Sequence, residues 1–185
     1  MVPSTSAPGD VGPFVISCYS AVPLLVKEIP VEGSGMHKMI IRGSWSRKAG
    51  TAVGCPNHGA YHKNPTYRLR TEIKSRYDSV GIIARVHVAS PPGGSPGGAA
   101  LNVTLYLLPI GGDPQVPPDA SPAGPRPPVV ATSNGGIYET ETAVLEARLA
   151  NGRRYVLVPS TFDPVEVEFV LEVYSFPRCD IRQVQ

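Results

Sequence analysis

The chain has 185 residues, among them 19 glycines and 21 prolines, two residue types that weaken a helix interior. This composition argues against a helical bundle or a repeated βαβ fold, while 42% apolar residues suffice for one hydrophobic core. No stretch approaches the length of a membrane span, and the first residues lack the features of a signal peptide. Three widely spaced cysteines, Cys18, Cys55 and Cys179, suit reduced thiols in a cytoplasmic protein.

The net charge of +2 is unevenly distributed along the chain. Between Arg42 and Arg76 lie eight basic residues and one acid, Glu72, so this stretch carries +7 and the remainder −5. Such an asymmetry is typical of a docking surface for an anionic partner, although an ordinary solvated face gives the same pattern.

The pattern of apolar and polar residues along the chain predicts an all-β fold. Residues 1–12 are expected to form a disordered lead-in, and residues 13–185 a single domain. Apolar and polar residues then alternate with the period of a strand at residues 39–41, 67–69, 82–88, 101–107, 143–150, 155–157 and 167–173. We therefore expect an antiparallel β-sandwich of about eight strands. Pro/Gly-rich stretches at residues 90–100 and 109–128 are expected to be loops. The Asn151-Gly152 pair predicts a hairpin.

The residue pattern predicts no active site. The sequence lacks a G-x-S-x-G elbow and a P-loop, and no cysteine lies between a strand and a helix. Cys55, His58 and His62 offer three zinc ligands without a second pair, so we expect a turn with a buried thiol. Aspartates that could bind calcium are scattered singly, so calcium binding lacks support and no cofactor is predicted.

Two blocks of the sequence are more specific than the general features of a β-sandwich. The first runs from Gly43-Ser-Trp45 through Thr51-Ala-Val-Gly54-Cys55-Pro-Asn57 to Asn64-Pro65-Thr-Tyr67. The second runs from Tyr155-Val-Leu-Val-Pro159-Ser160-Thr161-Phe162-Asp-Pro164 into Glu168–Ser175. Together they resemble domain III of calpains, a C2-like β-sandwich, over roughly residues 36–175. The family pattern has Gly where Val53 stands.

The resemblance implies a regulatory fragment of a calpain-like cysteine endopeptidase. The catalytic Cys, His and Asn of calpains belong to a separate core, so the chain is not expected to be an enzyme by itself. It is most similar to the terminal domain of the PalB type, which carries C2-like domains in tandem and acts with ESCRT-III at endosomes. The implied neighbours are the protease core and a second C2-like domain. The implied location is the cytoplasm, with recruitment to endosomal membranes.

The residues of the two blocks also have structural roles. Trp45 suits a buried anchor whose N–H finds a partner, and glycines permit tight connections. Phe162 is expected to plug the end of the sandwich. The full set of expected structural residues is Gly43, Trp45, Gly54, Cys55, Asn64, Pro65, Tyr67, Pro159, Ser160, Thr161 and Phe162.

The charge pattern predicts a basic binding face. If the strands around Tyr67 and Ile82 pair, one outer face carries Arg68, Arg70, Arg85 and His87, with Lys63, Lys74 and Arg76 near its rim. We expect this face to bind a protein partner, for which the resemblance suggests an ESCRT-III subunit. Two alternatives are binding to anionic phospholipid membranes and intramolecular regulation of the protease core. Aromatic residues are too few in this region to predict nucleic-acid binding.

Overall fold

The computed structural model describes residues 12–26, 31–71, 77–89, 98–109 and 128–184. It divides into two units, Met1–Pro30 and Val31–Gln185. The second unit contains all the strands in the described part of the chain, so the sandwich begins later than the boundary predicted at residue 13. Most residues of the two Pro/Gly-rich stretches, 90–97 and 110–127, lie outside the described ranges.

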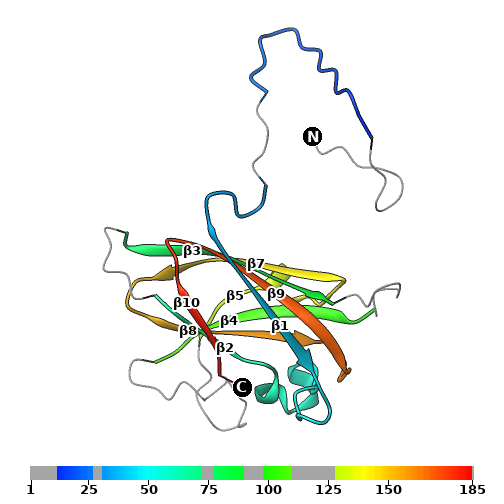
Figure 1. Ribbon diagram of the computed structural model, residues 1–185, viewed down its shortest axis with the longest axis vertical. Coiled ribbons are helices and arrows are strands. Elements are labelled where there is room, and N and C mark those ends of the chain that lie inside the picture. The colour runs from blue at the N-terminus through cyan, green and yellow to red at the C-terminus, as the bar shows by residue number, and fades with distance from the viewer. Residues whose placement is uncertain (1–11, 27–30, 72–76, 90–97, 110–127, 185) are drawn as a thin grey trace. The chain divides into compact units, whose positions relative to one another are not determined.

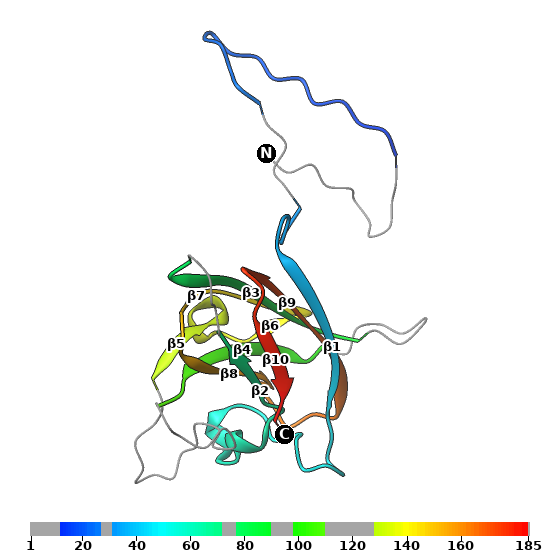
Figure 2. The same cartoon turned by 60° about the vertical axis from the view of Figure 1, so that its left-hand side comes forward.

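The sandwich consists of two antiparallel sheets, which Figures 1 and 2 show as stacked layers. One sheet has four strands in the order β1-β9-β3-β7. The other has six, in the order β10-β2-β8-β4-β5, with β6 paired to β4. The four-stranded sheet comprises β1 (His37–Trp45), β9 (Val167–Phe176), β3 (Ser79–Val88) and β7 (Thr142–Ala150). The six-stranded sheet comprises β10 (Asp180–Gln183), β2 (Tyr67–Arg70), β8 (Arg154–Thr161), β4 (Ala100–Leu107), β5 (Val129–Thr132) and β6 (Glu139–Thr140).

Alternation along the strands produces the core between the sheets. In β3 every second residue from Val80 to Val88 is buried, as the period of two predicts. Leu101, Val103 and Leu105 of β4 face these residues from the other sheet. The predicted all-β antiparallel sandwich is therefore confirmed, with ten strands among the described residues.

A second apolar cluster covers part of the outer face of the six-stranded sheet. It is formed by Tyr61, Tyr106, Leu108, Val156 and Val158. Tyr61 comes from the short helix η2 (Tyr61–Lys63), which follows η1 (Pro56–His58). A third short helix, η3 (Ser133–Gly136), follows β5. Because of this cover, β8 is buried on both faces after Arg154, unlike a strand with one solvated face.

The Asn151-Gly152 turn does not close a hairpin, so that prediction is wrong. β7 pairs with β3, whereas β8 pairs with β2 and β4, and the turn therefore carries the chain from one sheet to the other. The buried hydroxyl of Thr71 donates to the carbonyls of Ala150 and Arg153, at 3.0 and 3.1 Å. Gly152 N–H in turn donates to the Thr71 carbonyl. These tertiary bonds hold the turn in place of a β7–β8 ladder.

Candidate functional site

The predicted basic face is not one surface, because its strands do not pair. β2 lies between β10 and β8 in the six-stranded sheet, and β3 lies between β9 and β7 in the four-stranded sheet. Arg68 and Arg70 therefore point outward from one sheet, while Arg85 and His87 point outward from the other. Lys63 is exposed in η2. Lys74 and Arg76 lie outside the described residues.

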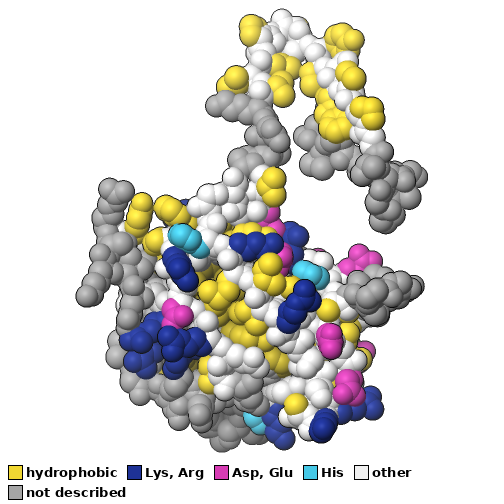
Figure 3. Space-filling model, viewed as in Figure 1, with side chains coloured by type: hydrophobic (Ala, Val, Ile, Leu, Met, Phe, Trp, Pro, Cys, Tyr) yellow, Lys and Arg dark blue, Asp and Glu magenta, His cyan; other side chains and the backbone are white. Residues whose placement is uncertain are grey.

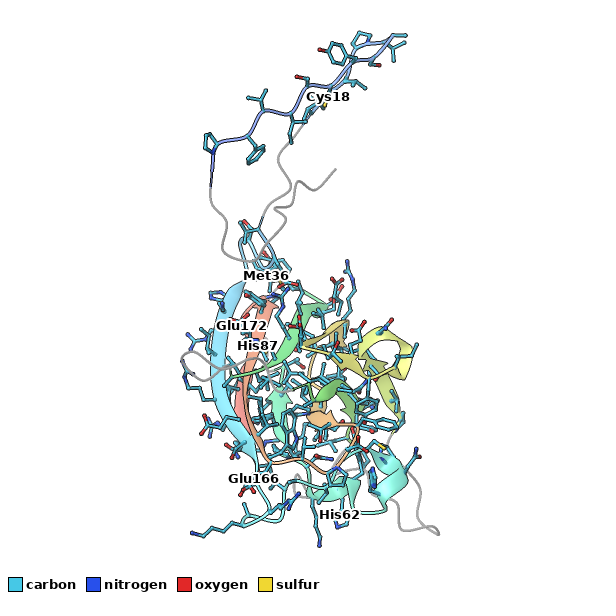
Figure 4. All side chains as sticks on the ribbon, turned by 90° about the vertical axis from the view of Figure 1, so that its right-hand side faces the viewer. Cys18, Met36, His62, His87, Glu166 and Glu172 are labelled. Carbon is cyan, nitrogen blue, oxygen red and sulfur yellow. The ribbon has the colours of Figure 1, made fainter. Side chains whose placement is uncertain are left out.

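The outer face of the four-stranded sheet carries charged side chains, and two of its basic residues form ion pairs with acidic ones. Arg85 is ion-paired with Glu32 at 2.5 Å, and Lys38 with Glu172 at 2.6 Å. A hydrogen bond from Lys38 is the main reason that the pKa of Glu172 lies below its usual value. Figure 4 shows Glu172 and His87 near each other on this sheet, with His62 at the opposite end of the sandwich. Arg85 is thus engaged within the molecule.

Arginines gather instead on the outer face of β10, β2 and β8. The antiparallel register places Arg182 opposite Arg68, and Arg154 opposite Arg70. We call these four residues, Arg68, Arg70, Arg154 and Arg182, the arginine patch. Figure 3 shows a dense group of basic side chains, with an acidic one beside it, where β10 and β2 lie in Figure 1.

The arginine patch carries an excess of positive charge. Asp180 lies opposite Arg70 in the register and accepts a hydrogen bond from Arg182 Nε at 3.0 Å. No ion pair within the described part of the chain involves Arg68 or Arg154. Like charges on directly opposite residues of a sheet cost stability. An anionic group bound across the patch would relieve this repulsion, and guanidinium groups hold carboxylates in a two-pronged geometry.

A surface hollow of about 380 Å³ adjoins the arginine patch. Its lining is basic apart from Asp180 and two sulfur-containing residues. It consists of Met39, Arg70, Arg178, Cys179, Asp180 and Arg182. Cys179 is buried, and burial raises the pKa of its thiol, which makes it a weak nucleophile. The hollow can therefore receive an acidic side chain, but it offers no activated group for covalent chemistry.

Sequence reasoning missed Arg154, Arg182 and Arg178 as members of this surface. They lie far from Arg68 along the chain, and β9, which is next to β10 in sequence, belongs to the other sheet. Alternation around the buried Ile181 could have placed Arg182 on an outer face. Only the pairing of β10 with β2 places it beside Arg68.

The two sequence blocks that resemble calpains meet at one end of the sandwich. Trp45 Nε1–H donates to the carbonyl of Pro159 at 3.4 Å, and the Trp45 ring packs on Phe169 with a centroid distance of 4.3 Å. Cys55 N–H donates to the Phe162 carbonyl at 3.0 Å. These contacts join β1 to β8 and β9, which places Trp45 at the junction of the two sheets.

Other block residues fix the connections around this junction. The side-chain amide of Asn64 donates to the carbonyls of Gly54 and Tyr61, at 2.9 and 3.0 Å. A Cβ atom on Gly43 would lie 2.5 Å from the Phe169 ring, which explains the absence of a side chain there. Thr161 donates to the Asp163 carbonyl, Ser160 hydrogen-bonds to Tyr138, and Pro65 is buried.

Phe162 does not plug the sandwich, so that prediction is wrong. Its side chain is 45% exposed and packs edge-on against Tyr138. The Phe162 backbone contributes instead, since its N–H donates to Ala100 and its carbonyl accepts from Cys55.

Metal ligands do not converge within the described ranges, where no group of three or more His, Cys, Asp or Glu could hold an ion. His58 lies 4.0 Å from Asp163, and Cys55 is buried. In the same ranges, no helix has both the length and the hydropathy that a membrane crossing requires.

Fold and surface together define an antiparallel β-sandwich module with an arginine-rich outer face. No family model matches the chain. Its sequence is 25% identical over 175 residues to the calpain-like protease palB/RIM13 of Cryptococcus neoformans. This match covers 95% of the present chain and 19% of that protein. It is 30% identical over 148 residues to calpain clp-4 of Caenorhabditis elegans, which covers 75% of this chain and 20% of that protein.

These matches confirm the resemblance to calpain-like proteases. The chain spans about one fifth of the length of the curated relatives that it matches. It is a β-sandwich related to one segment of those proteins.

Proposed function

We propose that the chain is a non-catalytic module of a calpain-like protease that binds an acidic segment of a protein partner through the arginine patch. The observation that carries this proposal is the register of β10, β2 and β8, which sets four arginines side by side with Asp180 as the one acidic residue in these paired positions. Charges at the rim of an interface raise association rates and select partners. The module would in this way position the protease.

The chemistry of the surface favours a carboxylate-rich partner. The hollow beside Arg70 and Arg182 has room for one acidic side chain, while the half-buried Arg68 and the exposed Arg154 can contact the residues next to it in the partner's sequence. The relationship to palB/RIM13 directs the search to ESCRT-III subunits, and an acidic tail or helix of such a subunit fits this surface. Recruitment to endosomal membranes would follow from that contact.

The test compares two double charge reversals. Arg68→Glu with Arg154→Glu should weaken binding to recombinant ESCRT-III subunits about tenfold. Arg42→Glu with Arg148→Glu makes the same change of charge at exposed positions of the four-stranded sheet and should leave binding unchanged. Both variants should unfold at nearly the wild-type temperature. Affinity is measured by titration calorimetry, and equal weakening by the two variants would refute the proposed surface.

Vesicles distinguish a protein partner from a lipid. Sedimentation with phosphatidylcholine vesicles, with and without phosphatidylserine and with calcium varied, should show little binding of the wild-type chain. Strong sedimentation that requires phosphatidylserine and is lost in Arg68→Glu with Arg154→Glu would assign the surface to the membrane instead. Regulation of the protease core is tested separately, by comparing the activity of the full-length protease with and without this module.

A further inference from the structure

The two sheets of the sandwich are in close contact along one side and open along the other. On the closed side, β7 contacts β4 and β5 of the other sheet and the short helix η3. On the open side, β1 makes extensive contact only with β9 within the described part of the chain. The edge strands on this open side are β1 and β10 (Figures 1 and 2). The hydrogen bond from Trp45 joins β1 to the other sheet only at the end of the strand.

Two adjoining hollows lie along the opening between β1 and β10. The larger is the hollow of about 380 Å³ beside the arginine patch. The smaller, of about 250 Å³, shares Met39, Arg178 and Cys179 with it and has the apolar Val173 and Ile181 in its lining. Figure 3 shows hydrophobic side chains at this surface, between groups of basic ones. We call the two hollows together the edge groove, which has an apolar section and a basic section.

The outer edge of β1 is an unpaired strand of nine residues. β1 pairs with β9 along its whole length, and no strand of the described chain pairs with its other side. Every second residue of such an edge directs its N–H and C=O away from the sheet, where an added strand can pair with them. Natural edges are usually blocked by a proline, a bulge or an inward-pointing charge. β1 has a continuous register without proline, and its inward residues from Met39 onward are Met39, Ile41, Gly43 and Trp45.

The charges around the edge groove favour an acidic strand. The larger hollow is lined by three arginines, Arg70, Arg178 and Arg182, against the one acid Asp180. Arg42 is exposed on β1, and among the described residues no ion pair involves Arg42 or Arg178. Guanidinium groups hold carboxylates through paired hydrogen bonds. A segment that carries carboxylates would therefore balance the excess of positive charge.

A second copy of the chain is a poor occupant of the same edge. β1 contains Lys38 and Arg42 and no acidic residue, so pairing of two β1 strands would bring together charges of one sign. Like charges on neighbouring positions of paired strands destabilise a sheet. The arginines of the two edge grooves would also meet at that interface. Charge therefore favours a different chain, with acidic residues.

We propose that an extended acidic segment of a protein partner adds to the free edge of β1, as a fifth strand of the four-stranded sheet. Residues two apart in a strand share a face. An apolar side chain of the segment then enters the smaller hollow over Met39, and an acidic one two positions away meets the arginines of the larger hollow. Main-chain hydrogen bonds supply affinity and the hollows supply specificity. The inference rests on the proposed function for the acidic character of the partner, and it adds how that partner is held.

The first experiment compares two synthetic peptides with the same side chains. The probe is the fluorescently labelled, amidated octapeptide Thr-Leu-Thr-Glu-Thr-Leu-Thr-Glu, which presents leucine and glutamate in turn on one face of a strand. The second peptide carries N-methyl groups on its fourth and fifth residues, so a donor facing β1 is lost in either alignment. By fluorescence polarisation, the methylated peptide should bind the chain at least about tenfold more weakly than the probe. Equal binding of the two peptides would overturn strand addition.

Substitutions in the edge groove separate strand addition from simple charge attraction. Met39→Lys adds a cation, yet it fills the apolar hollow and points a charge inward along the edge. We expect it to weaken binding of the probe at least about tenfold, whereas charge attraction alone predicts tighter binding, which would overturn the proposal. Val129→Lys adds the same charge at an exposed position of β5 and should change affinity by less than about twofold. Arg178→Glu, at an exposed position, should also weaken binding and supplies the test if Met39→Lys lowers stability.

Hydrogen exchange locates the added strand. With saturating probe, the edge-facing amides of residues 37–42 should exchange at least about tenfold more slowly, and those of residues 129–132 should be unchanged. Unchanged exchange in β1 would overturn the proposal. Protection of β1 without the probe, together with a dimer in sedimentation velocity, would overturn it in favour of a second copy. Protection by phosphatidylserine vesicles and not by the probe would overturn it in favour of a membrane.

The proposed function and this inference can fail separately. The double charge reversals at Arg68 and Arg154 test the proposed function and leave β1 unaltered. If they weaken binding of ESCRT-III subunits while N-methylation does not weaken binding of the probe, the arginine patch stands and strand addition is overturned. If N-methylation and Met39→Lys both weaken binding of the probe while the reversals have no effect on the subunits, strand addition stands and the arginine patch is overturned.

Discussion

Tyr67 combines complete burial with a hydroxyl that has no hydrogen-bond partner among the residues the structure describes. A buried hydroxyl without a partner costs free energy that its apolar counterpart avoids. We expect Tyr67→Phe to raise the free energy of unfolding by about 1 kcal/mol in urea denaturation. Tyr155→Phe is the matched control, because its hydroxyl accepts from Ala150 N–H at 2.8 Å, and it should lower stability by about 1 kcal/mol. A loss of stability in both variants would contradict this account.

The same hydroxyl makes stability depend on pH in the alkaline range. Burial raises the pKa of Tyr67 to about 12. Below about pH 10 the phenol is protonated in the folded and unfolded chains alike. Between about pH 10 and 12 the unfolded chain ionises first, so the free energy of unfolding falls as pH rises. This decrease in the free energy of unfolding should be smaller in Tyr67→Phe. Part of the decrease should remain, because the buried Tyr61 also has a raised pKa.

At the scale of the elements, the hydroxyl of Thr71 holds the connection between β7 and β8. Thr71→Val keeps the shape but removes the donor to the carbonyls of Ala150 and Arg153. We expect the free energy of unfolding to fall by about 1–2 kcal/mol, measured by urea denaturation. Thr142→Val, on the outer face of β7, makes the same chemical change at a hydroxyl that forms no hydrogen bond with the described residues, and should be nearly neutral. Equal effects of the two substitutions would show that the turn does not need Thr71.

The strands themselves could be predicted because each carries its own signal. Alternation in β3 and β9 fixes which residues face inward, whatever their neighbours are. Pairing is a different matter, since it joins residues far apart in sequence. The alternation of Tyr67 with Arg68 predicts β2 equally well whether β2 pairs with β3 or, as the structure shows, with β8 and β10.

At the scale of the whole molecule, the two sheets should unfold together. Trp45, the only tryptophan, is fully buried, and it connects β1 of one sheet to β8 of the other through the Pro159 carbonyl. Its fluorescence should therefore change at the same urea concentration as the far-ultraviolet circular dichroism. A fluorescence transition at a lower urea concentration would mean that the sheets separate before their strands unfold.

The sequence alone determined the fold class and the resemblance to calpain domain III. Both depend on local signals, namely alternation within strands and two blocks of contiguous residues around Trp45 and Pro159. It also determined that Arg68 and Arg70 face outward, because they alternate with the apolar Tyr67 and Leu69, which the structure shows to be buried.

Only the tertiary structure decided which charges share a surface. Arg85 and His87 were grouped with Arg68 on the assumption of one strand pair, and the structure assigns them to opposite sheets. Arg154 and Arg182 joined the patch through the β8–β2 and β2–β10 registers, which no local sequence pattern encodes. The physical reason is that alternation reports the face of a strand, whereas its neighbours are set by burial of the whole core.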